Sequence, residues 1–470
     1  MSSISRILSV AAGALRAQQS AISTTSHNVA NAATEGFSRQ RTLMNPGDPL
    51  RLPEGNFGSG VQVAGVERMR DELLDGSFRS ESSRTEAFQT HSQLLGRVEG
   101  MLAEPGDEGL SAALDRFLAA FSELATSPES TAARSSLRQR SDALTTRMND
   151  LAAGLDRVRQ EETTRLAQVI DRAQVIVDDL TNLNRRIVSA ETGGNSAPDL
   201  RDQQDRALDE LATLLPVEAI RNANGSVRVH LDGIGLVDGP DPKPIELASI
   251  DGVFRVRVGA AVLAPGAGEG RIGGILEFLN QDLPALSDGL DEMAAGLVDT
   301  VNEIHRTGTN PMGEEGVDFF HTRLDGNGGP LPATATGIRL SDAVLQSSQA
   351  IAAGSGTDPG QPENQYVAGS NDIALQIARL RDQALPELGT TLSDRYDGLV
   401  GELAGTLRRS MDSAEIHGIL SEQADLRRTS VSGVSLDEEM ANLIQFQAAY
   451  SAAARMVSTA DEMLQTLLRI

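Results

Sequence analysis

The two ends of the chain carry hydrophobic positions at helical spacing. Near the N-terminus these positions step by four and three residues in turn, and they are Ile4, Leu8, Ala11, Leu15, Gln18, Ile22, Thr25 and Val29. Near the C-terminus a seven-residue repeat passes through Leu436, Leu443, Tyr450, Val457 and Leu464, with Met440, Gln447, Ala454, Asp461 and Leu468 as its second row. Both patterns are typical of a coiled-coil seam. Since an isolated helix cannot bury its own stripe, we expect the two ends to pair and further copies of the chain to complete the burial.

Heptad spacing also marks the interior of the chain. One pattern covers residues 144–158 and resumes, after a phase shift, over 169–187. Two further patterns cover 286–304 and 388–407. These segments predict long helical hairpins rather than compact units.

The period changes after Pro216. Val227, Val229 and Leu231 alternate with polar residues, and the dipeptides Asn224-Gly225 and Asp232-Gly233 favour tight hairpin turns. Residues 217–264 therefore predict a small β insertion. A second zone, 306–365, is dense in Gly, Pro, Asn and Asp, which predicts an exposed, irregular connection with one small cluster of its own around Asp318-Phe319-Phe320.

Together these patterns predict a mainly α fold: an elongated, multi-domain rod of long helices, with coiled-coil pairs formed by both chain ends and a small β insertion in the middle. We expect a terminal coiled-coil assembly domain from residues 1–45 plus 430–470. A helical rod domain would comprise 46–216 plus 272–429, and a small outer β domain 217–271.

Composition restricts the possible partners. The chain has 41 basic and 66 acidic residues, a formal net charge of −25, which argues against binding to nucleic acid or to an anionic membrane surface. Only 14 of its 470 residues are aromatic, too few for the deep pockets of a typical enzyme of this size. Cysteine is absent, the N-terminus lacks the features of a cleaved secretory signal, and no apolar run approaches the length needed to insert into a membrane.

The candidate catalytic and binding motifs give little support for an active site or a ligand-binding site. Residues 268–273 match a Gly-x-Gly-x-x-Gly pattern, but no second strand follows, so we interpret them as a glycine-rich loop. Residues 325–336 fail the calcium-loop pattern, and the six histidines lack zinc-ligand spacing. The pair Glu438-Glu439 is most simply a solvated helix face, and His27 a polar position at a contact between subunits. We therefore expect no catalytic site, metal or cofactor, and hence no enzyme.

Two terminal motifs and two internal ones carry a family resemblance. Asn28-Val29-Ala30-Asn31-Ala32-Ala33-Thr34-Glu35-Gly36-Phe37-Ser38-Arg39-Gln40 resembles the N-terminal signature of bacterial flagellar rod, hook and hook-associated proteins, and Ser432–Leu443 resembles their C-terminal signature. Within the first motif, Asn31 and Gly36 can end the helix and turn the chain. The stretches 183–187 and 199–205 narrow the resemblance to members that join hook and filament.

The resemblance implies a structural, non-catalytic subunit of the bacterial flagellum that joins the hook to the filament. Such proteins are exported unfolded by the flagellar type III apparatus, are held beforehand in the cytoplasm by a chaperone on the C-terminal helix, and end up outside the cell. The implied partners are further copies in a helical ring, hook protein below, and the second junction protein and filament above.

Alternatives remain open at this point. They are the second junction protein or a flagellin-like axial protein, an enzyme carried on a flagellar scaffold, and a cytoplasmic signalling coiled coil. The predicted assembly interface comprises Ile4, Leu8, Leu15, Ile22, Val29, Asn31, Gly36, Phe37, Leu436, Met440, Leu443, Tyr450, Val457, Leu464 and Leu468.

Overall fold

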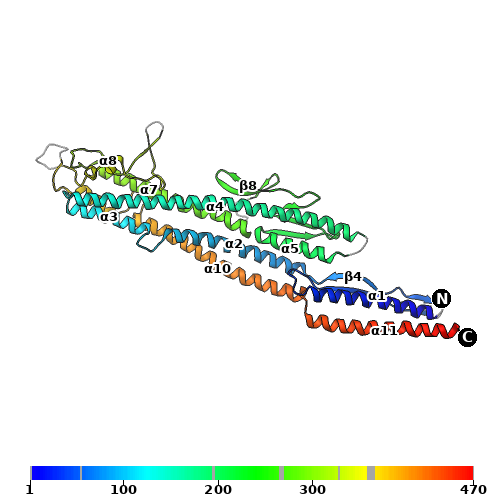
Figure 1. Ribbon diagram of the computed structural model, residues 1–470. Coiled ribbons are helices and arrows are strands. Elements are labelled where there is room, and N and C mark those ends of the chain that lie inside the picture. Colours follow the sequence, from blue (N-terminus) through cyan, green and yellow to red (C-terminus); the bar gives the residue numbers. More distant parts are fainter. Residues whose placement is uncertain are drawn as a thin grey trace.

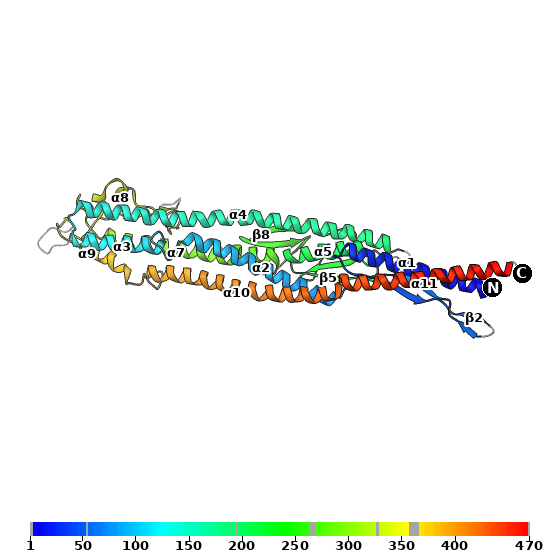
Figure 2. The same cartoon turned by 60° about the horizontal axis from the view of Figure 1, so that its bottom comes forward.

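The protein forms an elongated rod whose two termini lie at the same end (Figures 1 and 2). The computed structural model describes residues 3–52, 55–192, 196–263, 269–325, 329–356 and 366–468. Helices α1 (Ser3–Ala30) and α11 (Leu436–Leu468) pack side by side and make up the terminal end, which we call the arm. The rest, which we call the rod, is built on α2 (Glu72–Leu102), α4 (Thr131–Glu191) and α10 (Leu392–Ser432). The predicted architecture of long helices with a small β insertion is confirmed.

The longest helix, α4, joins the two central heptad segments into one uninterrupted element. It has 61 residues and is therefore about 90 Å long. The Ser130 hydroxyl caps its start by accepting a hydrogen bond from the Ala133 backbone at 3.1 Å. Its buried face includes Leu144, Leu151 and Leu155, which belong to the apolar core that runs along the rod.

Three shorter helices fill the space between these long ones. They are α3 (Leu110–Thr126), α5 (Pro198–Leu214) and α6 (Gly270–Glu277), and α6 continues through a π-helical turn, η1 (Phe278–Asp282), into α7 (Leu283–Arg306). Glycines let α6 approach its neighbours closely, because a Cβ at Gly270 or Gly274 would lie 2.4 Å from the backbone oxygen of Leu214 or Ala87. Of the motif glycines Gly270 thus has a packing role, and Gly268 lies outside the described residues. The interpretation of 268–273 as a loop is wrong for residues 270–273, which form the start of α6.

The β insertion consists of two antiparallel three-stranded sheets beside α4. The first contains β5 (Val217–Arg221), β6 (Val227–Leu231) and β7 (Ile234–Val237); the second contains β8 (Ile245–Ile250), β9 (Val253–Val258) and β10 (Ala261–Val262). Gly225 and Gly233 have positive φ angles in the turns predicted for them. The buried side chains of both sheets are part of the same core as the helices.

A hairpin between α1 and α2 was not predicted from the sequence. Strand β1 (Gln40–Pro46) pairs with β4 (Val61–Arg68), and the small pair β2 (Leu50–Leu52) and β3 (Gly55–Phe57) forms its tip. The hairpin lies along α1, where a Cβ at Gly13 would be 3.0 Å from the Val61 carbonyl oxygen. The alternation of buried and exposed side chains along β1 and β4 is weak, since several side chains on both faces of the hairpin are exposed.

The expectation of an exposed connection over 306–365 is wrong for much of this zone. Phe319 and Phe320 are fully buried and pack against Phe117 and Phe121 of α3. The backbone of these two residues is buried without loss of hydrogen bonds. The Asn302 side chain accepts from both phenylalanine N–H groups, at 2.9 and 2.8 Å, and donates to the Phe320 carbonyl, and the Phe319 carbonyl accepts from the Ser341 N–H. The remaining short elements of this end are β11 (Arg323–Leu324), β12 (Pro330–Leu331), α8 (Asp342–Gln346), η2 (Ser348–Ala350), α9 (Asp372–Ala378) and η3 (Arg379–Arg381).

His305 stabilises the same end of the rod as a neutral side chain. Its Nδ1 donates to the Val317 carbonyl at 2.6 Å, and its Nε2 accepts from the Ala352 N–H at 2.9 Å. Complete burial lowers the pKa of His305 from 6.5 to about 4, against the smaller opposing effect of the Val317 hydrogen bond.

We predict that His305 makes the protein less stable as the pH falls from 6.5 towards 4. In that window the unfolded chain binds a proton that the folded chain does not, so the free energy of unfolding decreases by up to about 1.4 kcal/mol per pH unit. Urea unfolding of wild type and His305→Gln at pH 7 and pH 4.5 measures this contribution. The variant should lose less stability on acidification, with the half-buried His321→Gln as control; parallel losses in all three proteins would contradict the assignment.

Candidate assembly site

Small side chains occupy much of the buried surface of the arm. On α1, which packs against both α11 and the β1–β4 hairpin, the buried positions include Ala11, Ala17 and Ala21, and among the described side chains of α11 they are Glu439, Ala453 and Ala460. Alanine lets two helices approach closely over a long distance. The large apolar side chains of α11 are therefore not the ones that contact α1 most fully.

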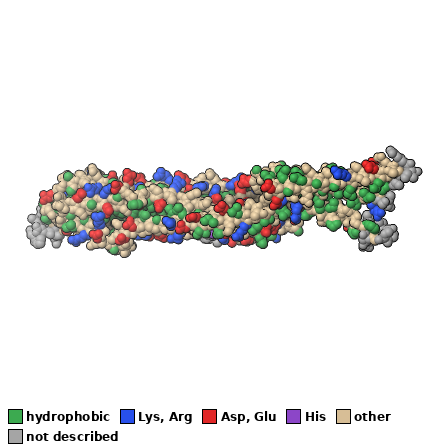
Figure 3. All heavy atoms as spheres, turned by 90° about the horizontal axis from the view of Figure 1, so that it is seen from below, with side chains coloured by type: hydrophobic (Ala, Val, Ile, Leu, Met, Phe, Trp, Pro, Cys, Tyr) green, Lys and Arg blue, Asp and Glu red, His purple; other side chains and the backbone are tan. Residues whose placement is uncertain are grey.

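The structure places the predicted interface residues in three environments. Ile4 is buried; Leu8, Leu15, Ile22, Val29, Asn31, Phe37, Leu443, Val457 and Leu464 are half-buried; and Leu436, Met440, Tyr450 and Gly36 are exposed. Leu468 ends α11, and its side chain lies outside the described residues. On α11 the buried row is shifted one position before the predicted second row, which turns the predicted stripe partly towards solvent. Figure 3, which views the molecule from the side on which α10 and α11 lie, shows hydrophobic side chains gathered there.

The N-terminal motif ends α1 and turns the chain, as its Asn and Gly residues predict. Helix α1 stops at Ala30, and the Asn31 side chain donates to the His27 carbonyl at 3.0 Å. Gly36 has φ +72°, a conformation that favours glycine. The chain then enters β1 beside the end of α10.

The N-terminal and C-terminal motifs meet at a buried carboxylate. Glu439 accepts hydrogen bonds from Asn28 Nδ2 at 2.9 Å and from Arg39 Nε at 2.8 Å, and its side chain is only 2% exposed. Asn28 also exchanges two hydrogen bonds with the backbone of Gln40. Interpreting Glu439 as part of a solvated face is therefore wrong, whereas its neighbour Glu438 is exposed and pairs with Arg39 at the surface.

The internal motif at 199–205 joins the same network from α5. Asp202 accepts from the Ser38 hydroxyl at 2.6 Å and from its N–H at 3.2 Å, and Asp199 accepts from the Gln40 side chain at 3.0 Å. His27 lies 3.4 Å from Asp199, so it has a partner within the chain in addition to any contact between subunits. Three motifs that are far apart in sequence thus form one polar joint between arm and rod.

Asp205, at the end of that motif, anchors the joint to the rod. Arg68, Arg70, Arg79 and Arg221 each place a guanidinium nitrogen within 3.3 Å of its carboxylate. Burial alone would raise the pKa of Asp205, but these four cations outweigh it and hold the pKa well below its usual range. The carboxylate therefore stays ionised at every physiological pH.

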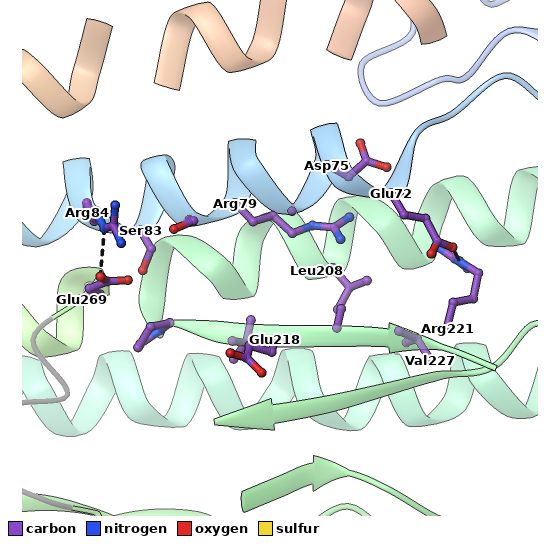
Figure 4. A pocket seen from close by; sticks show the side chains of 15 residues that line it. Glu72, Asp75, Arg79, Ser83, Arg84, Leu208, Glu218, Arg221, Val227 and Glu269 are labelled. Carbon is purple, nitrogen blue, oxygen red and sulfur yellow. Dashed lines mark hydrogen bonds and ion pairs between the residues drawn. The ribbon is translucent and has the colours of Figure 1, made fainter. Parts of the chain in front are cut away.

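A cavity of about 440 Å³ adjoins this cluster between α2, α5 and β5 (Figure 4). Its arginines are ion-paired: Arg79 with Asp205 and Asp209, Arg84 with Glu269, and Arg221 with Asp205 and Glu72. Their positive charge is already neutralised by these carboxylates, which disfavours anion binding in the cavity.

One constellation resembles a hydrolase triad that the sequence did not reveal. His91 of α2 lies 2.7 Å from Asp282 and 3.2 Å from the Ser410 hydroxyl of α10. However, the Ser410 hydroxyl is buried and also lies 3.1 Å from the Phe88 carbonyl, to which it can donate its proton. The three residues connect α2, η1 and α10, and this geometry fits a structural bridge better than an activated nucleophile. Among the described residues, histidine and carboxylate side chains form no group able to hold a metal ion.

Comparison with known proteins identifies the family. A protein named flagellar hook-associated protein 1, from Bacillus subtilis, is 31% identical to the chain over 504 aligned positions, which cover 98% of the chain and 97% of that relative. The chain belongs to the flagellar hook-associated protein 1 family. Hook-associated protein 1 of Escherichia coli and of Salmonella typhimurium are each 24% identical, with 99% of the chain and all of each relative covered.

Family models match the parts of the molecule separately. Residues 95–320 match the FlgK helical domain of flagellar hook-associated proteins, 428–470 the C-terminal region of flagellar basal body rod FlgEFG proteins, and 8–37 the flagella basal body rod protein. The solved structure of the flagellar hook junction protein FlgK from Burkholderia pseudomallei has the same fold, with a TM-score of 0.66 at 14% identity over 76% of the chain and all of that structure. The two terminal models cover the α1 and α11 segments that the structure pairs in the arm.

The hook-associated protein 1 assignment confirms the resemblance found in the sequence and does not favour the second junction protein or a flagellin. The chain is thus a flagellar component. No helix in the described ranges has the length and apolarity required to cross a membrane.

We predict that Glu439 holds the joint together. Glu439→Ala leaves Asn28 and Arg39 without their buried acceptor, which costs about 1–3 kcal/mol locally. Amide hydrogen exchange over residues 28–40 and 432–443 should therefore accelerate about tenfold or more. Glu438→Ala is the matched control, since its exposed ion pair is worth under about 1 kcal/mol. Equal acceleration in the two variants would show that the buried carboxylate has no special role.

Proposed function

We propose that the chain is a structural, non-catalytic subunit that joins the hook to the filament of a bacterial flagellum. The observation that supports this most directly is the match to hook-associated protein 1 from Bacillus subtilis over nearly the full length of both chains. The paired terminal helices support it too, because part of their predicted apolar stripe faces solvent and would be buried by neighbouring subunits.

The proposal includes a route and a set of partners. The chain leaves the cell through the flagellar type III apparatus, after a cytoplasmic chaperone has held its C-terminal helix, and is secreted to the extracellular end of the hook. There it contacts further copies of itself in a helical ring, hook protein below, and the second junction protein and filament above. The exposed side chains of Leu436, Met440 and Tyr450 on α11 are the surface that we assign to contacts between copies.

We also propose a division of labour along the molecule. The terminal domain, 1–45 plus 430–470, which contains the arm, carries assembly. The helical part, 46–216 plus 272–429, surrounds it, and 217–271 faces outward. The hairpin β1–β4 straddles the first boundary, because it packs along α1 and also supplies Arg68 to the Asp205 cluster.

We predict that charged substitutions on the arm block assembly without unfolding the rod. Leu443→Asp or Leu464→Asp puts a carboxylate on the half-buried flank of α11, where a neighbouring copy would have to bury it. Each variant should be exported, yet cells should carry hooks without filaments and shed filament protein into the medium. Electron microscopy and swimming assays measure this.

Leu345→Asp is the matched control, because Leu345 is 42% exposed at the opposite end of the rod. Cells with this variant should swim normally. Filaments of normal length on cells that carry Leu443→Asp and Leu464→Asp together would count against the arm as the assembly surface. Fractionation adds a separate check, since the wild-type chain should remain with filamentless hooks.

A further inference from the structure

Strand β5 is an edge strand, because β6 pairs with one side of it and no described strand pairs with the other. In the β5–β6 ladder Arg221 lies opposite Val227, but both backbone groups of Val227 bond to the Asn184 side chain, at 2.8 and 2.9 Å. Since the bonds of an antiparallel ladder alternate, Arg221 and Ala219 direct their N–H and C=O groups away from β6. Among the described residues, the N–H and C=O groups of Ala219 bond to no group outside the sheet.

This free edge borders the cavity of about 440 Å³ described above, which we call the β5 groove. Figure 4 shows α2, which carries Ser83, across the groove from the strand that carries Glu218. Gly76, Ser80 and Ser83 contribute small side chains to the α2 side, and a Cβ at Gly76 would have no atom within 4 Å. The volume is within the range of ligand pockets, and the small side chains leave space for an extended backbone about 4.8 Å from β5.

The Ser83 hydroxyl indicates the kind of group that the groove binds. This residue is only 1% exposed, and its Oγ has no hydrogen-bond partner among the described residues. Figure 4 shows its side chain directed from α2 into the groove. A buried hydroxyl without a partner costs free energy. The groove therefore offers a hydrogen bond to a polar group that the described residues do not provide.

The outer face of β5 adds preferences for particular side chains. Ile220 is 46% exposed, and Glu218 is exposed with no cation within ion-pair distance among the described residues. Opposite residues of an antiparallel pair share a face, so an added strand would place one side chain beside Ile220 and another beside Glu218. An apolar side chain fits the first position and a basic one the second. The alternate positions face the groove, where small side chains fit.

We propose that the β5 groove binds an extended, basic segment of a different protein as a fourth strand of the β5–β6–β7 sheet, antiparallel to β5. In this general mode of peptide recognition, backbone hydrogen bonds supply affinity and alternate side chains supply specificity. A different protein is the occupant because every described strand of this chain is already paired within its own fold. The net charge of −25 also attracts basic segments. The inference goes beyond the role in joining hook and filament and does not depend on it.

Fluorescence anisotropy with the full chain and a fluorescein-labelled peptide, Ser-Val-Ala-Lys-Ser, tests the proposal. We expect saturable binding with a Kd below about 1 mM. Methylation of the backbone nitrogen of the peptide alanine, which lies opposite Ala219, should weaken binding about fivefold or more, because one backbone hydrogen bond is lost. A glutamate in place of the lysine should weaken it about threefold or more. Absence of saturable binding, or equal binding of the methylated peptide, would overturn strand addition, and equal binding of the glutamate peptide would overturn the preference for a basic segment.

Ala219→Pro removes the same hydrogen bond from the protein side. The proline ring replaces an N–H that points away from β6, so the ladder stays intact, as it does for prolines in edge strands. The variant should unfold at the wild-type temperature and bind the peptide about fivefold more weakly or worse. Ala219→Ser keeps the N–H and is the matched control. Equal affinity of the two variants would overturn β5 as the binding edge; if the proline variant does not fold, the methylated peptide decides.

Photo-cross-linking in cells identifies the source of the segment. With p-benzoylphenylalanine at Ile220 of the full chain, we expect a product that contains one chain and a different protein. Adding Ala219→Pro should lower its yield about threefold or more, and an excess of the peptide should do the same in a lysate. A product with the mass of two chains, a yield that neither change affects, or no product at all would overturn a different protein as the occupant.

Discussion

Asp205 lies beneath four guanidinium groups that come from β4, the β4–α2 turn, α2 and β5, and the rest of the molecule is arranged around this contact. Burying a carboxylate is costly unless its charge is fully compensated. The four arginines that compensate it also pair with Asp202, Asp75, Asp209 and Glu72, so their elements meet at one point in a shared network of charges. This network fixes the position of α5, whose next acidic residue towards the N-terminus, Asp202, then binds the segment that follows α1.

The joint between arm and rod differs in kind from the core of the rod. The rod is held together by burial of Leu, Val, Ile and Phe side chains, which is strong but not directional. The joint consists of hydrogen bonds and ion pairs among Asn28, Ser38, Arg39, Asp202 and Glu439. Such bonds contribute little net stability but demand a defined geometry, so they set the direction in which the arm leaves the rod.

Much of this fold could be predicted from the sequence, because long helices leave a strong periodic signal. The two terminal helices, the helix over 144–187 and the hairpin turns at Gly225 and Gly233 all follow from local patterns. The pairing of the two ends was expected because neither terminal helix can bury its apolar stripe alone. What could not be predicted depends on contacts between distant segments. Phe319 and Phe320 are buried because Asn302 satisfies their backbone, and no spacing rule indicates that.

In the joint between arm and rod, too, local patterns could be predicted from the sequence, whereas contacts between distant segments could not. The three motifs were recognisable as stretches of sequence, but their convergence was not, since it depends on Arg68 and Arg221 in strands with no special pattern. Glu439 resembled any acidic residue in the first turn of a helix. The apolar repeat of α11 predicted a helix correctly, yet it could not show that alanines rather than leucines lie deepest against α1.

Both termini lie at one end of the rod, so changes in sequence length at the other end need not affect the arm. The chain leaves the arm and runs along the rod and back twice, out through α2 and α3 and back along α4, then out through α5 to α7 and back along α10. Residues added or lost near the turns at the far end therefore change how far the molecule reaches without displacing the arm. The same holds for the sheets beside α4, which leave and rejoin the rod between neighbouring helices. A lineage can thus alter the reach and outer surface of this subunit while the dimensions of the arm stay constant.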